Sequence, residues 1–414
     1  MNEELFLERV KRVETATALK EPDRVPVCPF IASYAMRYGG SSYQDIFYDY
    51  EKAGEAVVSF YRDHPQMDIT NFGAFSCGKA NELAGIKVID WPGRPGGKVD
   101  RYSSHQVIEM ELMMPEEYPE LLRDFTGFML RKYLPRAYGN IKGTAGLNLT
   151  PTIVLSTGLF SSFGTEEAQE TFRLFAEIAA EERKAAEASA KYRHQITDLG
   201  FPPIMVMGSE APYDILGDYF RGTMGIFEDL HDPDLQDYVE KACWMFADMQ
   251  IERLRALCDP NAPVRRVSFP LHKGMDGFMS PAQYERFYWK PLKKVMLSLI
   301  DMGMTPYLYT EGPYNTRLET LADMPAGKAI YHFENVDMKR AKEILGGIAC
   351  ICGNLSLSHL EFGTREKVVD DTKRLLDTCA PGGGYLFDLS GCLENAKPEN
   401  LEAMFETLEI YGKY

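Results

Sequence analysis

The sequence has no long apolar run, no excess of basic residues and no dense cysteine pattern. None of its apolar stretches approaches the roughly 18 residues that a membrane-spanning helix needs. Its N-terminus, MNEELFLERVKRVE, predicts a charged amphipathic helix and not a signal peptide. With 61 acidic and 45 basic residues the net charge is -16, which disfavours nucleic-acid binding because phosphate contacts need clustered Lys and Arg. We therefore expect a cytoplasmic protein that binds neither membranes nor nucleic acids.

The eight cysteines are few for 414 residues and include no CxxC pair, which is typical of a reducing compartment and not of a disulfide framework. A cysteine with a special role is then expected to be a metal ligand or a nucleophile. Hydrophobic residues make up 45% of the chain and charged residues 26%, an ordinary globular composition. Because no low-complexity linker or short repeat divides the chain, we expect a single domain over residues 1–414.

From about Phe201 onward, short apolar runs alternate with amphipathic helical patterns. The runs cover residues 203–208, 266–271, 305–310, 329–334, 348–353 and 384–389. After the second run, Ser280 is a suitable N-cap and Pro281 a suitable first residue of a helix whose apolar side chains recur every three or four positions. Such repeats indicate parallel strands with right-handed crossovers, in a sheet buried on both faces.

Two earlier runs, at residues 25–30 and 68–72, bring the number of expected strands to about eight. This number favours an α/β fold of the (β/α)8 TIM-barrel type, preceded by an N-terminal extension. The segment of about 86–111 breaks the rhythm with WPGRPGG between alternating runs, and it is predicted to be a β-hairpin insertion. A long Ala/Glu-rich helix is expected near residues 165–192.

In such a barrel the catalytic groups lie at the C-terminal ends of the strands. Glu311, Cys352 and Cys392 end or follow three of the expected strands, and His332 and Glu334 lie on the strand between. Thiolate, carboxylate and imidazole groups are zinc ligands, and a catalytic site with three protein ligands leaves one position for substrate. We predict a zinc site formed by Glu311, Cys352 and Cys392. The alternative is that the cysteines only pack and the glutamate lines a turn.

Further polar residues are expected at the same end of the barrel. His272 and Asp276 follow the second run and suit proton transfer or substrate binding, or else they tie down the next helix. Tyr213 and Asp214 follow the first run, where a turn with a packed tyrosine is the alternative to substrate binding. 

Asn315 and Arg317 follow Glu311 closely, and Arg317 either anchors a substrate carboxylate or pairs with Glu319. Aromatic side chains near the strand ends, among them Tyr34, Phe72 and Tyr309, would suit a pocket for a flat aromatic substrate.

The segments HKGMDGFMSPAQYERFYWKPL, YTEGPYNTRLE, CGNLS and GGGYLFDLSGCLENAKPENLEAMFE resemble the uroporphyrinogen decarboxylase superfamily, best between residues 204 and 411. The resemblance implies a (β/α)8 barrel and one of two chemistries: porphyrinogen decarboxylation, or zinc-dependent methyl transfer involving corrinoid proteins. The decarboxylases carry an Arg-Gln-Ala-Gly-Arg stretch after the first strand, whereas this chain has only Arg37 there. Decarboxylation is therefore disfavoured.

Among the methyltransferases, the chain is most similar to those that demethylate phenyl methyl ethers such as vanillate. Some of these use an acidic ligand followed by two cysteines with 39 residues between them, and 39 residues lie between Cys352 and Cys392. The family spacing would place the acidic ligand near Asp323, but Glu311 is preferred because it shares the inward parity of Tyr309. His332 and Glu334 also stay open as ligands.

The resemblance implies a mechanism in which zinc acts at the ether oxygen and cob(I)alamin, carried by a partner corrinoid protein, accepts the methyl group. His272 or Tyr309 would then donate a proton to the leaving phenolate. A decarboxylase-like lyase, or a methyltransferase for another methylated substrate, are the alternatives. The oligomeric state, with a homodimer as one option, is not determined by the sequence.

Overall fold

A six-stranded parallel sheet forms the centre of the protein in the computed structural model, which describes residues 2–149 and 158–414. Its strands lie in chain order and comprise β3 (Met207–Gly208), β4 (Arg266–Leu271), β5 (Thr305–Pro313), β6 (Ile330–Asn335), β7 (Cys350–Cys352) and β8 (Tyr385–Leu386). All six strands predicted from residue 203 onward are confirmed, together with their parallel pairing.

The two strands expected nearer the N-terminus are reduced to isolated parallel bridges. Val27 bridges Phe387 next to β8, and Thr70 bridges Pro203 next to β3. Between these two segments, the Asp68 amide donates to the Val27 carbonyl at 2.9 Å. Prolines 26, 29, 202 and 203 remove amide donors from these segments, which shortens the hydrogen-bond ladder. The structure thus establishes an α/β fold with a six-stranded parallel sheet, and these bridges extend its pattern at both edges.

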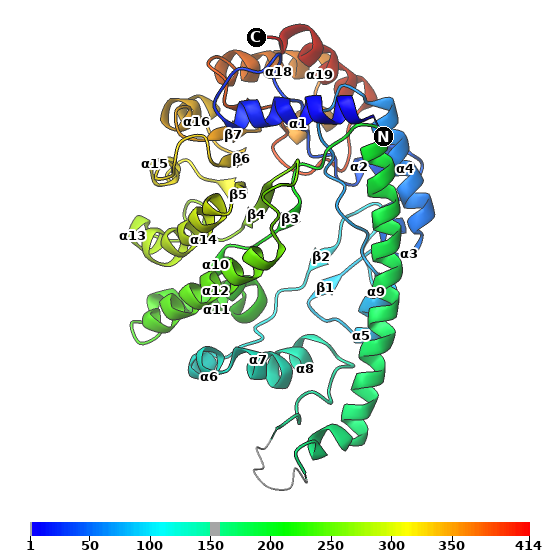
Figure 1. The fold of residues 1–414 in the computed structure, drawn as a ribbon, viewed down its shortest axis with the longest axis vertical. Coiled ribbons are helices and arrows are strands. Elements are labelled where there is room, and N and C mark those ends of the chain that lie inside the picture. Colours follow the sequence, from blue (N-terminus) through cyan, green and yellow to red (C-terminus); the bar gives the residue numbers. More distant parts are fainter. Residues whose placement is uncertain (1, 150–157) are drawn as a thin grey trace.

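Helices pack against the sheet along its whole length (Figure 1). In the C-terminal half they comprise α10 (Pro212–Asp214), α11 (Gly222–His231), α12 (Gln236–Leu257), α13 (Pro281–Gln283), α14 (Lys290–Asp301), α15 (Leu318–Leu321), α16 (Met338–Leu345), α17 (Leu357–Phe362), α18 (Arg365–Cys379) and α19 (Pro398–Tyr411), with π-helical turns at Ile215–Arg221 and Tyr284–Trp289. Ser280 caps the helix that was predicted after β4, with its hydroxyl accepting from the Gln283 amide.

The N-terminal extension is a helix, α1 (Glu3–Thr17), which is capped by Asn2. Its Val13 and Ala16 side chains join a buried cluster with Tyr307, Cys350 and Cys352 of the sheet. The helix therefore covers one end of the strands (Figure 1). Further helices of this half are α2 (Tyr34–Tyr38), α3 (Asp45–Tyr48), α4 (Tyr50–Asp63), α5 (Gly78–Ala84), α6 (Tyr118–Arg123), α7 (Phe125–Phe128) and α8 (Leu134–Ala137), with 3-10 turns at Pro115–Glu117 and Ser161–Gly164 and a π turn at Met129–Tyr133.

Two irregular features were predicted correctly. Residues 86–111 contain an antiparallel pair, β1 (Ile89–Asp90) and β2 (Gln106–Val107), and Ile89 pairs with Val107. The long helix α9 (Glu166–Asp198) runs along one side of the molecule (Figure 1) and extends six residues beyond its expected end. Among the helices of the described residues, none has the length and apolar character to cross a membrane.

Candidate functional site

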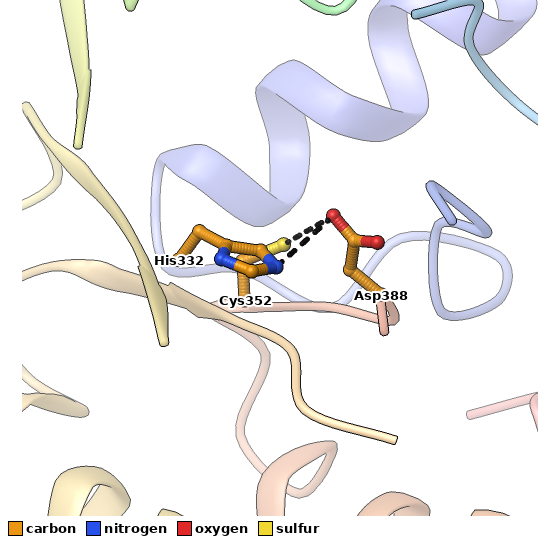
Figure 2. A group of neighbouring side chains, drawn as sticks. All are labelled: His332, Cys352 and Asp388. Atoms are coloured by element: carbon orange, nitrogen blue, oxygen red, sulfur yellow. Dashed lines mark hydrogen bonds and ion pairs between the residues drawn. The ribbon is translucent and has the colours of Figure 1, made fainter. Parts of the chain in front are cut away.

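The register of three neighbouring strands sets a tyrosine, a histidine and a cysteine side by side. Tyr309 of β5 pairs with His332 of β6, which pairs with Cys352 of β7. Asp388 follows β8 and completes a buried group with His332 and Cys352 (Figure 2). The Asp388 Oδ2 atom lies 3.5 Å from His332 Nε2 and 3.6 Å from Cys352 Sγ. Within the described residues this is the one group of three His, Cys, Asp or Glu side chains whose ligand atoms all lie within 4.8 Å of one another.

Burial keeps this group uncharged. It raises the pKa of Asp388 to about 8, although the amides of Leu389 and Phe30 donate to the carboxylate. Burial also lowers the pKa of His332 to about 4 and raises the pKa of the Cys352 thiol well above its usual value. A neutral imidazole, a thiol and a protonated carboxyl therefore share a dry site at pH 7.

The donor set of this group suits a metal ion. Ligands held at about 2.0–2.3 Å around a tetrahedral zinc lie about 3.3–3.8 Å apart, which matches the two separations from Asp388. His332 Nε2 donates to the Leu389 carbonyl at 2.9 Å, so that binding through this atom would replace that hydrogen bond. The other ring nitrogen, Nδ1, has no partner within the described residues. A bound cation would displace the thiol and carboxyl protons.

Asp388 gives a testable pH dependence of stability. Its carboxyl ionises near pH 4 in an unfolded chain but keeps its proton to about pH 8 in the fold. The folded state binds more protons in this window, so stability falls as the pH rises through it. For the chelator-treated protein, Asp388→Asn is expected to reduce the loss of Tm between about pH 5 and pH 8 by roughly 2–4 °C, measured by scanning calorimetry. An unchanged loss would contradict the raised pKa.

The two cysteines of the predicted zinc site lie at different depths. Cys352 is fully buried, with its Sγ 3.8 Å from the Tyr307 hydroxyl, whereas Cys392 is exposed, with its Sγ 3.9 Å from the Tyr309 hydroxyl. Tyr309 contacts both depths, because its hydroxyl lies near Cys392 and its ring stacks on the buried His332 at a centroid distance of 4.3 Å. Within the described residues, the ligand atoms of Glu311, Cys352 and Cys392 do not all lie within 4.8 Å of one another. This ligand set therefore stays a prediction.

The other acidic candidates occupy contrasting positions. The Glu334 carboxylate accepts from the Gly312 amide, and a Cβ placed on Gly391 would lie 3.8 Å from its Oε1 atom, so Glu334 faces the loop that carries Cys392. The side chain of Asp323 is 65% exposed and pairs with Lys293. Asp323 therefore lies on the outer surface, away from the buried group.

The His272 ring lies between two carboxylates, those of Asp218 and Glu311. Its Nδ1 lies 2.6 Å from Asp218 Oδ2, and its Nε2 lies 3.6 Å from Glu311 Oε1. Although burial opposes a charge on the ring, hydrogen bonds with Asp218 and Glu311 raise the pKa of His272 to about 11. The imidazole is thus a proton-bearing group at pH 7. Sequence patterns did not single out Asp218, although it lies four residues after Asp214, in the segment that follows the same strand.

Two residues predicted to bind substrate, Tyr213 and Asp214, are buried in the structure, and their role in substrate binding stays a prediction. Asp214 is fully buried and accepts from the amides of His272 and Lys273 and from the Tyr288 hydroxyl. Tyr213 is also fully buried. The Asp214 carboxylate thus fixes the backbone of the loop after β4, and the Tyr213 ring packs against Tyr288 at a centroid distance of 5.8 Å.

Asp276, Asn315 and Arg317 join the loops that follow β4, β5 and β6. Asp276 accepts from the amide and hydroxyl of Thr316, and the Asn315 Oδ1 atom accepts from the Asp337 amide. Arg317 is 2% exposed and donates to the carbonyls of Gly274 and Met279. The alternative surface pair between Arg317 and Glu319 is wrong, because Glu319 pairs with Arg340.

A cavity of about 400 Å³ opens beside Cys392. Its wall combines aromatic and apolar side chains with a few polar ones, including Phe30, Tyr43, Phe72, Asn71, His105 and Glu394. Phe30 also makes an edge-to-face contact with Tyr309 at a centroid distance of 5.8 Å, which connects the cavity with the tyrosine above the buried group. Phe72 was expected in an aromatic pocket. His105 comes from the insertion and carried no recognisable sequence signal.

The family model for uroporphyrinogen decarboxylase (URO-D) matches residues 205–411, which is half of the chain. The chain belongs to the uroporphyrinogen decarboxylase family. The matched range contains β3 to β8 and every residue of the buried group, so family membership and the geometry concern the same part of the molecule.

Individual relatives in the URO-D family are distant. The chain is 29% identical over 154 residues to a uroporphyrinogen decarboxylase from Syntrophotalea carbinolica, covering 37% of this chain and 43% of that protein. For a uroporphyrinogen decarboxylase from Azoarcus sp. the identity is 25% over 186 residues, covering 44% and 49%. The chain thus spans less than half the length of these curated relatives.

A solved structure resembles the whole chain in fold. A methyltransferase from Methanosarcina mazei superposes with a TM-score of 0.59 over 97% of this chain and 98% of its own, at 16% sequence identity. At this identity the likeness concerns the fold alone. It shows that the N-terminal half, which the URO-D family model does not match, also follows an architecture known from another protein.

Proposed function

We propose that the protein is a zinc-dependent methyltransferase that moves the methyl group of a methoxylated aromatic compound to the cob(I)alamin of a corrinoid protein. The observation that carries this proposal is the aromatic-walled cavity that opens on the Cys392 thiol, next to the buried His332, Cys352 and Asp388. Membership of the URO-D family and the fold shared with a methyltransferase support it. We further propose that residues 25–30 and 68–72 complete a (β/α)8 barrel, with residues 1–414 as one domain.

Two ligand sets are proposed for the metal, and both contain Cys352. The first is Glu311, Cys352 and Cys392, which follows the cysteine spacing, and the second is the observed group with His332 and Asp388. Zinc bound at either set would act as a Lewis acid toward the ether oxygen of the substrate. A shift of Tyr309, whose ring lies over His332, would be needed to expose the second set to the cavity.

Protein side chains would then supply a proton to the leaving phenolic oxygen. In the transfer, the methyl group leaves without the bonding electrons, which remain on the phenolic oxygen, and this oxygen takes up a proton. His272 carries a proton at neutral pH and contacts Glu311, so it is the proposed proton donor. Tyr309 lies beside Cys392 and is the second candidate. The aromatic wall would hold the ring and exclude water.

A decarboxylase-like lyase is the second candidate, because the curated relatives are uroporphyrinogen decarboxylases. That reaction needs cations to bind the carboxylates of a large tetrapyrrole. No lysine or arginine occurs among the cavity residues that the structure describes. Arg37 is exposed and stacks over Tyr102 at 4.9 Å instead. These observations favour methyl transfer.

A substrate panel tests the proposed function. With a cob(I)alamin-loaded corrinoid protein, at least one methoxyphenol is expected to convert the cobalamin spectrum to that of methylcobalamin. Uroporphyrinogen supplied to the same preparation is expected to keep its carboxylates, as followed by chromatography. Decarboxylation of uroporphyrinogen with no methyl transfer from any methyl ether would contradict the proposal.

A further inference from the structure

Among the described side chains that line the cavity beside Cys392, the charged one is acidic. Aromatic rings of Phe30, Tyr43 and Phe72 form much of its wall, and Glu394 is the acidic residue on it. Among the lining residues that the structure describes, none is a lysine or an arginine. A ligand in this space therefore meets flat apolar surfaces and one carboxylate.

Glu394 also acts electrostatically on its neighbours in the cavity wall. Burial, and then the negative charge of Glu394, raise the pKa of Tyr43 to about 12. The Tyr43 hydroxyl lies 3.3 Å from His105 Nδ1. Desolvation lowers the pKa of His105, so that its ring is neutral at about pH 7.5 and offers no positive charge to a ligand. 

A substrate with its own carboxylate would be penalised twice in this cavity. With the ether oxygen at the proposed zinc, a carboxylate elsewhere on the ring would lose water in a largely apolar space without gaining a lysine or an arginine, and it would be repelled by Glu394. A hydroxyl or hydroxymethyl group would instead find hydrogen-bond partners in Asn71, His105 and Glu394. The volume of about 400 Å³ is at the low end for ligand sites and suits a single substituted ring.

We propose that this cavity selects methoxylated rings without an anionic substituent, and that Glu394 is the residue that rejects aromatic carboxylates. The proposal deepens and rests on the proposed function, because it assigns the cavity beside Cys392 to the methyl donor. It names the substrate class as neutral methoxyphenols and related alcohols. Rejection by an unpaired like charge is a common source of specificity.

The test compares vanillyl alcohol with vanillate, which differ in a hydroxymethyl group and a carboxylate on the same methoxyphenol ring. Binding is measured by calorimetry without the corrinoid protein, so no turnover occurs. Wild-type protein is expected to bind the alcohol at least about tenfold more tightly. Glu394→Gln should narrow this ratio to within about threefold by improving vanillate binding, and Glu394→Lys should reverse it. Glu402→Gln on α19, outside the cavity, should keep the wild-type ratio.

The outcomes separate the selection from the chemistry. Equal binding of the two rings by wild-type protein, or a ratio that persists in Glu394→Gln, would overturn the proposed selection. If the alcohol is preferred but never transfers its methyl group to cobalamin, the selection stands and the proposed function fails. Methyl transfer from vanillate as efficient as from the alcohol would support the function and overturn the selection. Absence of binding for both rings would overturn both.

Discussion

Replacement of Cys352 by serine is expected to remove the bound metal and to lower methyl transfer by at least about 100-fold, because loss of a thiolate leaves too few ligands for zinc. Both proposed ligand sets contain this residue, so the prediction does not depend on which one is occupied. The measurements are the zinc content of the purified protein and the rate of methylcobalamin formation. Cys350→Ser is the matched control, since Cys350 lies on the same strand and is equally buried. The control should keep both zinc and activity.

Two more variants then distinguish the ligand sets. If Glu311, Cys352 and Cys392 hold the metal, Cys392→Ser should lose zinc and Asp388→Asn should keep it. If the observed buried group holds the metal, the pattern should be reversed. Circular dichroism should show a folded protein in each case, because Cys392 is exposed and asparagine has the shape of the protonated Asp388 side chain. Full zinc retention in both Cys352→Ser and Cys392→Ser would refute the metal assignment.

Much of the central sheet could be predicted because its strands are buried on both faces. The apolar runs at 305–310 and 348–353 have few polar residues and are bounded by turns, which is the pattern of parallel strands. The N-terminal runs carry a similar apolar pattern but contain Pro26 and Pro29, and only single bridges formed there. Hydrophobicity alone therefore predicted where these segments lie but overestimated their hydrogen bonding.

The site was harder to predict. The alternation of side chains along one strand does not show which residues of neighbouring strands lie side by side. Side-chain alternation correctly placed Tyr307 and Tyr309 on one face of their strand. Only the observed strand register, however, places His332 beside Tyr309 and Cys352. Asp388 joins them from beyond β8, and Glu394 and His105 meet at the cavity from loops almost 290 residues apart. Contacts of this kind depend on tertiary packing and leave no local pattern in the sequence.

Replacement of Glu311, the proposed acidic ligand, gives the second large expected effect. Glu311 is exposed at the end of β5, two residues beyond Tyr309, and it contacts the proton-bearing His272. Glu311→Gln keeps the size of the side chain but removes its charge. Zinc held by Glu311, Cys352 and Cys392 should therefore be lost. Methyl transfer should then fall by at least about 100-fold. Asp323→Asn is the control, because Asp323 pairs with Lys293 on the outer surface.

Glu311 has two roles in this proposal, as a metal ligand and as a partner of His272, and zinc analysis separates them. Loss of both zinc and activity in Glu311→Gln would identify Glu311 as a ligand. Loss of activity with full zinc content would place the metal on His332, Cys352 and Asp388, and would leave Glu311 as the group that holds the His272 imidazole in position. In that second case the pH profile should also change, because Glu311 is one of the three carboxylates, with Asp218 and Asp214, that raise the pKa of His272. Loss of zinc in Asp323→Asn with none in Glu311→Gln would show that the ligand was assigned to the wrong acidic residue.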